Sequence, residues 1–282
     1  MNSGEQVINT FKARYPNCFS NDSSSAIKGY PVKMHLKPNV VPVFRKPYSL
    51  PYKMIEKVDA KLYQLLAEEK LVKVDFSEWP SPIFAIPKRD NDVRICVDLK
   101  KDNSCLQVPT YAFPRCDDIF NTLNGGKVFC ALDLTEAYTL LKVDPAPQFF
   151  LTINTHRGLY RFTRLCYGVS SAPALFQQFM DTLLHDIPKT CYLDDVLCQG
   201  KDFVECGRIV EQVLKRLNHH NVRINSLKCK WFSTQVKYLG HVISEKGRSP
   251  APTLTEAILK APAPSNQKQL RSFLGLLNFT VH

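Results

Sequence analysis

The sequence predicts an α+β fold in which antiparallel hairpins alternate with amphipathic helices. Two pairs of short apolar runs, at 83–98 and 190–199, are each joined by a polar turn, which is the pattern of a β-hairpin. Elsewhere, as at 55–66 and 175–184, apolar residues recur every three or four positions, the spacing of a helix that buries one face. The chain has 282 residues, 44% of them hydrophobic, enough for one large unit or two to three subdomains.

The composition points to a polyanionic partner. The 37 lysines and arginines outnumber the 26 aspartates and glutamates, so the formal net charge is +11. A basic balance is typical of nucleic-acid-binding proteins, and it also fits ribosomal, membrane-surface and other basic soluble proteins. The motifs must therefore decide the function.

The cysteines and the N-terminus indicate a reducing compartment. The ten cysteines include no Cys-x-x-Cys pair, and several, such as Cys130 and Cys198, lie inside apolar strand-like runs. We therefore expect free thiols, with neither a disulfide framework nor a zinc site. Met1 is followed by polar residues, and no apolar run has the length of a membrane span. We expect an intracellular protein, cytoplasmic and/or nuclear, without a membrane partner.

Amphipathic spacing and terminal signals place the helices. Before the first helix, the polar run at 20–25 and several prolines predict a loosely structured arm with at most a strand at 33–36. Ser49 is a start signal for the first helix, and Gly125-Gly126 ends the second. The expected helices are 49–71, 116–123, a segment from Ser170 or Ser171 through Leu184, 204–217, 254–261 and 267–277.

Short apolar runs bounded by turn residues place the strands. The run 149–153 turns at 156–158 into 159–165, and we expect the basic tip of this hairpin to touch a phosphate backbone. The run 236–243 is expected to be one strand that turns at 245–247. The other expected strands are 83–87, 93–98, 128–133 and the two halves of 190–199.

The hairpin over 190–199 places Asp194 and Asp195 side by side at its tip. Two carboxylates about 5 Å apart at an effective dielectric of about 20 repel by roughly 3 kcal/mol, and a divalent cation between them relieves this cost. Asp133, at the end of the strand 128–133, is the best candidate for a third carboxylate. Such hard oxygen ligands favour Mg²⁺ or Mn²⁺ over zinc. Taken alone, the pair also fits an ordinary solvated turn.

A charged turn at 88–92 joins the strands of the first hairpin. Lys88, Arg89 and Arg94 can close on a polyphosphate, because ammonium and guanidinium groups pair with phosphate oxygens. Taken alone, an exposed basic turn is the simpler interpretation.

Five ordered motifs change both interpretations. Leu132-Asp-Leu-Thr-Glu-Ala-Tyr138 resembles the first aspartate motif of reverse transcriptases, and Tyr192-Leu-Asp-Asp195 resembles their catalytic box. Three further segments, 151–160, 168–177 and 238–243, resemble the polymerase part of gypsy-type LTR retrotransposon polyproteins. The resemblance implies a right-hand polymerase fold, with an antiparallel-sheet palm flanked by helices, fingers hairpins and a truncated thumb or connection.

The resemblance also divides the chain into interleaved parts. They are an N-terminal arm (1–46), the fingers (47–110 and 141–171), the palm (111–140 and 172–243, with the primer-grip hairpin) and the start of a truncated thumb or connection (244–282).

The resemblance assigns the site residues. It implies that Asp133 and Asp194 are direct ligands of two Mg²⁺ or Mn²⁺ ions, that Asp195 is the third catalytic carboxylate, and that Leu134 adds its backbone carbonyl. Tyr138 would lie under the sugar of the incoming nucleotide and leave no room for a 2′-hydroxyl. The other implied nucleotide-binding residues are Lys88, Arg94, Gly168 and Gln177, again with Leu134. The implied nucleic-acid-binding residues are Tyr192, Tyr238, Leu239, Gly240 and His241.

The implied activity is that of an RNA-directed DNA polymerase, a nucleotidyltransferase that extends a primer on an RNA or DNA template with deoxynucleoside triphosphates. RNase H and integrase modules are the expected neighbours in a longer polyprotein, and the sequence leaves the oligomeric state open. One alternative is a degenerate or co-opted remnant that binds nucleic acid without polymerising. Another is an RNA-dependent RNA polymerase, which usually carries a small or polar group where Tyr138 stands.

Departures from the family pattern support the inactive alternative. The segment 187–192 is one residue shorter than in its relatives, and a slip of one residue would turn the side chains of a strand to the other face. We therefore expect impaired activity if the hairpin is out of register. Cys166 stands where proline is common, Asp102 where an apolar residue is usual, and Asn91 where a turn glycine is usual.

Overall fold

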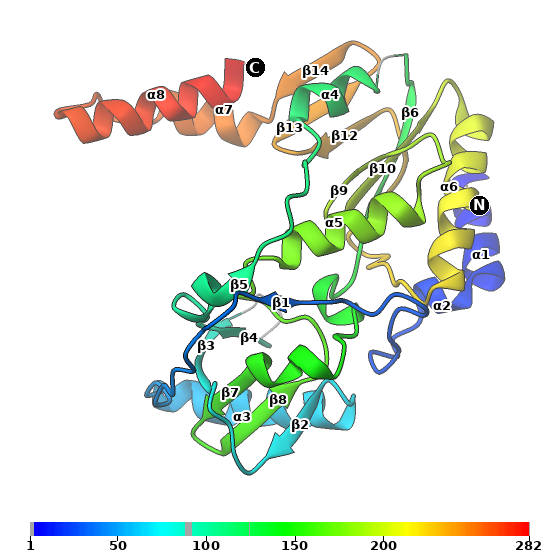
Figure 1. The fold of residues 1–282 in the computed structure, drawn as a ribbon. Helices are drawn as coiled ribbons and strands as arrows, with labels where there is room; N and C mark the ends of the chain where they lie inside the picture. Colours follow the sequence, from blue (N-terminus) through cyan, green and yellow to red (C-terminus); the bar gives the residue numbers. More distant parts are fainter. Residues whose placement is uncertain (1–2, 88–91, 124, 282) are drawn as a thin grey trace.

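Mostly antiparallel sheets joined by helices make up the fold, as the α+β prediction required. The computed structural model describes residues 3–87, 92–123 and 125–281. Within these residues the strands form one sheet of four, one of five, one of three and one of two (Figure 1).

The four-stranded sheet carries the Asp-Asp hairpin. Its order is β11-β6-β10-β9, and all neighbouring strands are antiparallel. Helix α6 (Phe203–His219) packs against β10 and β6, and α5 (Ala172–Leu183) against β9. The predicted strand 128–133 and hairpin 190–199 are confirmed. The strands are β6 (Val128–Asp133), β9 (Thr190–Tyr192), β10 (Asp195–Gly200) and β11 (Lys230–Ser233).

The five-stranded sheet combines two segments that lie far apart in the sequence. Its order is β2-β8-β7-β3-β4, and only the β3–β7 pair is parallel. Helix α3 (Tyr52–Ala67) covers β2 and β4 with its buried face, which includes Val58, Leu62 and Leu65. The predicted helix within 49–71 and the hairpin 83–98 are confirmed. The strands are β2 (Leu71–Val74), β3 (Ser81–Pro87), β4 (Val93–Val97), β7 (Thr152–Thr155) and β8 (Gly158–Phe162).

The hairpin formed by β7 and β8 differs from the prediction at two points. A 3₁₀ helix, η3 (Ala146–Leu151), replaces the start of the expected strand, so β7 begins only at Thr152. At the tip, Arg157 donates from Nε to Asp59 Oδ1 at 3.0 Å, and His156 Nε2 lies 2.7 Å from the same oxygen. A carboxylate of α3 therefore pairs with both basic side chains, but the side chain of Arg157 is still 53% exposed and its contact with a phosphate backbone stays a prediction.

The first part of the N-terminal arm is helical rather than loosely structured, and the rest of the arm is irregular apart from one short strand. Helices α1 (Ser3–Arg14) and α2 (Pro16–Phe19) pack against α6, and Phe11 and Cys18 are buried there. The prediction failed because the apolar stripe of α1 is short and its packing partner lies about 200 residues away. The strand expected at 33–36 is present as β1 (His35–Leu36), which pairs with β5 (Leu106–Gln107).

The three-stranded sheet corrects the strand expected at 236–243. Two strands, β12 (Gln235–Tyr238) and β13 (His241–Ser244), form a hairpin with its turn at Leu239 and Gly240, and β14 (Gly247–Pro250) follows. Both turn residues have positive φ, +46° and +79°, which reverses the chain inside the expected strand. Val236, Tyr238 and Ile243 form a second core cluster with residues of α4 (Cys116–Asn121). Beyond β14, α7 (Pro252–Leu259) and α8 (Gln267–Val281) extend away from the sheets (Figure 1).

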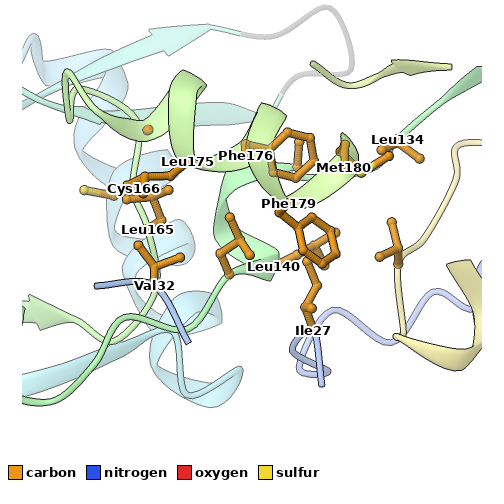
Figure 2. Packing of buried hydrophobic residues seen from close by; sticks show 14 of the residues in the cluster. Ile27, Val32, Leu134, Leu140, Leu165, Cys166, Leu175, Phe176, Phe179 and Met180 are labelled. Atoms are coloured by element: carbon orange, nitrogen blue, oxygen red, sulfur yellow. The ribbon is translucent and has the colours of Figure 1, made fainter. Parts of the chain in front are cut away.

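Helix α5 lies at the centre of the main core. Its buried side chains Leu175, Phe176, Phe179 and Met180 lie near Leu134 and Leu140, which follow β6, and near Leu165, which follows β8 (Figure 2). The predicted buried face of this helix is confirmed. Ser171 occupies the N-cap position, but its side chain makes no capping hydrogen bond. This packing joins the four-stranded sheet to the loop that leaves the five-stranded sheet.

All ten cysteines have free thiols, and eight of them, including Cys130 and Cys198, are buried. Among the helices of the described residues, none combines the length and the apolar character needed to cross a membrane.

Candidate active site

The Asp-Asp hairpin lies in register with the strand that ends at Asp133. Asp195 is the pairing partner of Asp133 on β6 and of Tyr192 on β9. Leu193 and Asp194 form the turn, and Leu193 has a φ of +54°. The backbone amide of Leu134 donates to the carbonyl of Asp194 at 3.1 Å. The shorter segment before the box therefore does not carry it away from Asp133.

Gln177 holds this turn from beneath. Its Oε1 accepts from the amide of Leu193 at 2.6 Å, and its Nε2 donates to the carbonyl of Cys191 at 3.1 Å and to Asp181 Oδ1 at 3.0 Å. The hydroxyl of Tyr111 donates to the other oxygen of Asp181. Gln177 is completely buried, so its expected nucleotide contact is corrected to a supporting position under the turn.

Two clefts meet at the carboxylates. The first cleft, of about 780 Å³, is bordered by the turn after β6, by the start of β4 and by the tip of the Asp-Asp hairpin. Its lining includes Asp133, Leu134, Glu136, Asp194, Arg94 and Lys228. The second cleft, of about 850 Å³, lies between the four-stranded and three-stranded sheets. Its lining includes Asp133, Asp195, Lys228, Lys230, Lys237 and Tyr238.

The three carboxylates therefore do not converge on one point. Asp133 lines both clefts, Asp194 lines the first and Asp195 lines the second. In the part of the chain that the structure describes, no group of three or more His, Cys, Asp or Glu side chains is placed to hold a metal ion. Asp133 and Asp194 share the first cleft, and a metal site formed by all three carboxylates stays a prediction.

The electrostatics of the carboxylates suit a divalent cation. The pKa of Asp195 is raised to about 6, mainly by burial and further by the negative charges of Asp194 and Asp133. Burial also raises the pKa of Asp133, against the opposing effect of Lys228, whose Nζ lies 3.9 Å from Asp133 Oδ1. Partly buried carboxylates that raise one another's pKa favour a nearby positive charge. Mg²⁺ commonly takes one or two carboxylates and completes its shell with water and substrate phosphates, so Asp133 and Asp194 fit it.

Tyr167 lines the first cleft and belongs to an aromatic group that includes Tyr138. The guanidinium of Arg94 lies 4.8 Å from the ring centroid of Tyr167. The ring of Tyr138 packs edge-to-face against Tyr167 at 5.2 Å and Phe176 at 5.7 Å. Burial and the nearby charge of Asp194 raise the pKa of Tyr138 to about 12, so this ring is neutral and close to the Asp-Asp tip. Lys88 lies outside the described residues.

Gly168 sets the position of Tyr167. Its φ is +113°, and a Cβ at this position would overlap with the carbonyl oxygen of Val97 at the end of β4. Asn103 fixes the same loop by donating to the carbonyl of Gly168 and accepting from the amide of Ser170, both at 2.9 Å. Gly168 thus acts through close backbone packing.

The β12–β13 hairpin presents its turn rather than its flanking side chains. Gly240 is exposed and Leu239 is half-buried. Tyr238 is 4% exposed and its hydroxyl donates to the carbonyl of Asp195 at 3.2 Å, and His241 is 6% exposed and packs on Phe120. The expected nucleic-acid contact is corrected to a supporting position for these two side chains. Tyr192, half-buried at the end of β9, packs beside Phe113.

The sequence analysis missed Lys228, Lys230 and Lys237. Lys228 lines both clefts, and the other two line the second. In the sequence, the only sign of this site is that Lys228 and Lys230 flank the apolar Cys229. Whether these lysines reach the clefts depends on how β11 pairs with β6, which the sequence does not reveal.

Asp102, one of the departures from the family pattern, has its own partners. Its Oδ2 lies 2.6 Å from Arg45 Nη2 and accepts from the hydroxyl of Ser81 at 2.7 Å. The buried charge is therefore paired, and the substitution does not signal decay. Cys166 is buried in the core, and Asn91 lies outside the described residues.

Comparisons with known proteins agree with this arrangement. The family described as "Reverse transcriptase (RNA-dependent DNA polymerase)" matches residues 52–243. The uncharacterized protein K02A2.6 of Caenorhabditis elegans is 34% identical over 241 residues, which are 84% of this chain and 19% of that protein. The Transposon Tf2-3 polyprotein of Schizosaccharomyces pombe is 34% identical over 201 residues, 70% of this chain and 15% of the polyprotein. The chain thus spans less than a fifth of either relative.

Solved structures show the fold. A foamy viral protease-reverse transcriptase in complex with double-stranded DNA matches 99% of this chain and 50% of its own with a TM-score of 0.90, at 23% identity. The native protease-reverse transcriptase of prototype foamy virus matches 97% of this chain and 37% of its own with a TM-score of 0.78, at 25% identity. The predicted right-hand polymerase fold is confirmed. Because the family match also covers more than half of its residues, this chain belongs to the reverse transcriptase family.

Proposed function

We propose that this chain is an RNA-directed DNA polymerase that adds deoxynucleotides to a primer 3′-hydroxyl. The observation that supports this most strongly is that Asp133 and Asp194 line one cleft with Arg94. Two carboxylates and a guanidinium that line one cleft suit a nucleoside triphosphate with its cations. The first cleft would then take the incoming nucleotide, and the second would take the primer end.

Two divalent cations fit the carboxylates of Asp133 and Asp194 together with the backbone carbonyl of Leu134. Bound there, Mg²⁺ or Mn²⁺ would supply activation of the 3′-hydroxyl and stabilisation of the leaving pyrophosphate. Arg94 would bind phosphate oxygens, and Tyr138 would support the sugar. Gln177 would keep Asp194 at the cleft by fixing the turn.

The partners follow from charge and from the relatives. Lys228, Lys230 and Lys237 line the second cleft, where a phosphate backbone would neutralise them. The foamy viral enzymes were solved with double-stranded DNA and with an RNA/DNA hybrid, and we propose a primed RNA or DNA template here. We also propose that the chain is divided into the interleaved fingers and palm segments expected from the sequence. In a longer polyprotein, RNase H and integrase modules would accompany it.

Primer extension tests the proposal. On an oligo-primed RNA template, with Mg²⁺ or Mn²⁺ and all four deoxynucleoside triphosphates, we expect template-directed products. An inactive remnant would bind the same primed template without extending it under either ion. That outcome would overturn the proposal in favour of the nucleic-acid-binding alternative, which the in-register hairpin does not favour.

Removing the ring of Tyr138 should relax sugar selection. If the ring supports C2′ of the incoming sugar, Tyr138→Ala opens space for a 2′-hydroxyl in a close-packed site. We expect ribonucleotide incorporation to rise by roughly tenfold or more relative to deoxynucleotide incorporation. Single-nucleotide kcat/KM ratios measure this, with Tyr63→Ala, an exposed aromatic of α3, as the control. Unchanged selectivity, or equal use of both sugars by the unaltered chain, would make Tyr138 an ordinary core aromatic.

Affinity for a primed template should fall steeply with salt. Lys230 is exposed in the second cleft, so Lys230→Ala should weaken binding for all sequences alike and reduce the slope of log K against log[salt] by about 1. Fluorescence anisotropy between low and physiological salt gives the slope. The matched control is Lys12→Ala. Lys12 is exposed on α1, which packs against α6, and its replacement should leave the slope unchanged. Equal slopes for both variants would exclude Lys230 from the phosphate contacts.

A further inference from the structure

A buried lysine links the five-stranded sheet to the segment that follows Asp133. Lys70, between α3 and β2, is 1% exposed. Its Nζ lies 2.6 Å from Glu68 Oε2 and 2.6 Å from Glu136 Oε2. Arg223, also buried, places Nη2 3.4 Å from the same oxygen of Glu136. Two cations from different parts of the chain thus meet one carboxylate.

Glu136 is the only one of these four side chains that lines the first cleft. Its side chain is 28% exposed and its φ is +54°, a left-handed conformation that costs energy for a residue with a Cβ. Such a conformation persists where the surroundings fix it. Here the fixed points are the ion pairs at Oε2 and the hydrogen bond from the hydroxyl of Thr139 to the carbonyl of Glu136.

Glu68 fixes Lys70 from the opposite side. Ser23 and Gln64 both donate to Glu68 Oε1. Burial alone would raise the pKa of Glu68, but hydrogen bonds from Lys70, Ser23 and Gln64 outweigh it and lower that pKa. Glu68 is therefore ionised at neutral pH and holds the ammonium group in place. If Lys70 turned away from Glu136, the buried carboxylate of Glu68 would also lose its positively charged partner.

An acidic side chain on the wall of the first cleft would repel a triphosphate. At an effective dielectric of about 20, a unit charge still acts noticeably over several ångströms. Lys70 and Arg223 meet the carboxylate from the protein side, which balances its charge and directs Oε2 toward the interior. Lys61, Arg94 and Lys228 also line the cleft and can face a phosphate chain, while Asp133 and Asp194 are the carboxylates proposed to hold the cations.

We propose that Lys70 is a positioning residue for nucleotide binding, which it serves by neutralising and fixing Glu136 at the wall of the first cleft. The inference rests on the proposed polymerase function, because it assigns the first cleft to the triphosphate. Lys70 touches no substrate and acts through Glu136.

A charge-rescue experiment tests this role. Lys70→Met keeps the length of the side chain and removes its charge, so it should raise KM for dTTP on a primed poly(rA) template roughly tenfold, with a smaller change in kcat. Glu136→Gln should lower KM about twofold, because the positive charges of Lys70 and Arg223 are then no longer fully balanced behind the cleft wall. In the double variant, Lys70→Met with Glu136→Gln, KM should return most of the way to the value of the unaltered chain. Lys73→Met, at an exposed position of β2, is the matched control and should leave KM unchanged.

The rescue separates charge compensation from simple packing. If Lys70 only fills space, adding Glu136→Gln to Lys70→Met leaves KM high or raises it further, and the proposal is wrong. Should Lys70→Met fail to fold, Glu136→Gln alone decides, because Lys70 keeps Glu68 as a partner. A KM above that of the unaltered chain would then contradict the proposal.

A second readout does not depend on activity. Hydrogen exchange of the amides at 134–139 should quicken about tenfold in Lys70→Met and not in Lys73→Met, with exchange in α6 unchanged. If the unaltered chain extends no primer, the proposed function fails and this readout alone decides the link between Lys70 and Glu136. Unchanged exchange at 134–139 would overturn it.

Discussion

Asp194→Asn should abolish primer extension while leaving the affinity for primed template nearly intact. The amide keeps the shape of the side chain but removes the negative charge that, with Asp133, would hold a divalent cation in the first cleft. We expect kcat to fall by more than about a thousandfold. Template binding should change less than about threefold, because the lysines of the second cleft are untouched.

The matched control is Asp186→Asn. Asp186 is exposed in the segment just before β9 and pairs there with Arg216 and His185, so its charge contributes nothing to either cleft at the carboxylates. Single-turnover extension and anisotropy on the same preparations separate chemistry from binding. Extension by Asp194→Asn at a rate within tenfold of the unaltered chain would refute the assignment of this carboxylate.

The sequence predicted the parts of the fold that local patterns control. Apolar residues recur every three or four positions in α3 and α5, and the strand ending at Asp133 is a short, nearly continuous apolar run, so local patterns reveal all three. The β12–β13 turn was not predicted because the mostly apolar run from Tyr238 to Ile243 resembles one strand, and Leu239, which has positive φ, is not a residue type typical of turns. Helix α1 was not predicted because its stability comes from packing against α6, which lies far away in the sequence.

The candidate site could likewise be predicted only in part from the sequence. The positions of Asp133, Asp194 and Asp195 at strand ends followed from the motifs, and the pairing of β10 with β6 brings them together. The direction of each carboxylate did not follow, because Asp194 in the turn and Asp195 in the strand line different clefts. Burial decided the rest: Gln177, Tyr238 and His241 carry the expected residue types but have their polar groups inside the protein. A motif names residues, and only packing shows which of them reach the cleft.

Replacing Gly168 with alanine should cost far more than the same change at Gly158. Both glycines have positive φ, +113° and +106°, so alanine is strained at either position. At Gly158 an added Cβ meets nothing within 4 Å, and we expect a loss of about 1–2 kcal/mol in the free energy of unfolding. At Gly168 the Cβ would overlap with the carbonyl of Val97, so overpacking against backbone adds to the strain and the loss should reach about 3–5 kcal/mol.

The functional consequence separates the two variants further. Relief of the clash must move the loop that carries Tyr167, or else the end of β4, and the amide of Val97 donates to the carbonyl of Tyr167 at 3.2 Å. Either shift disturbs the contact of Tyr167 with Arg94 and Tyr138 at the first cleft. Gly168→Ala should therefore lower kcat/KM for deoxynucleotides by roughly a hundredfold even where urea titration shows the chain still folded, whereas Gly158→Ala should stay within about threefold. Equal losses in the two variants would mean that backbone strain alone, and not the packing of Gly168 on Val97, governs this wall of the cleft.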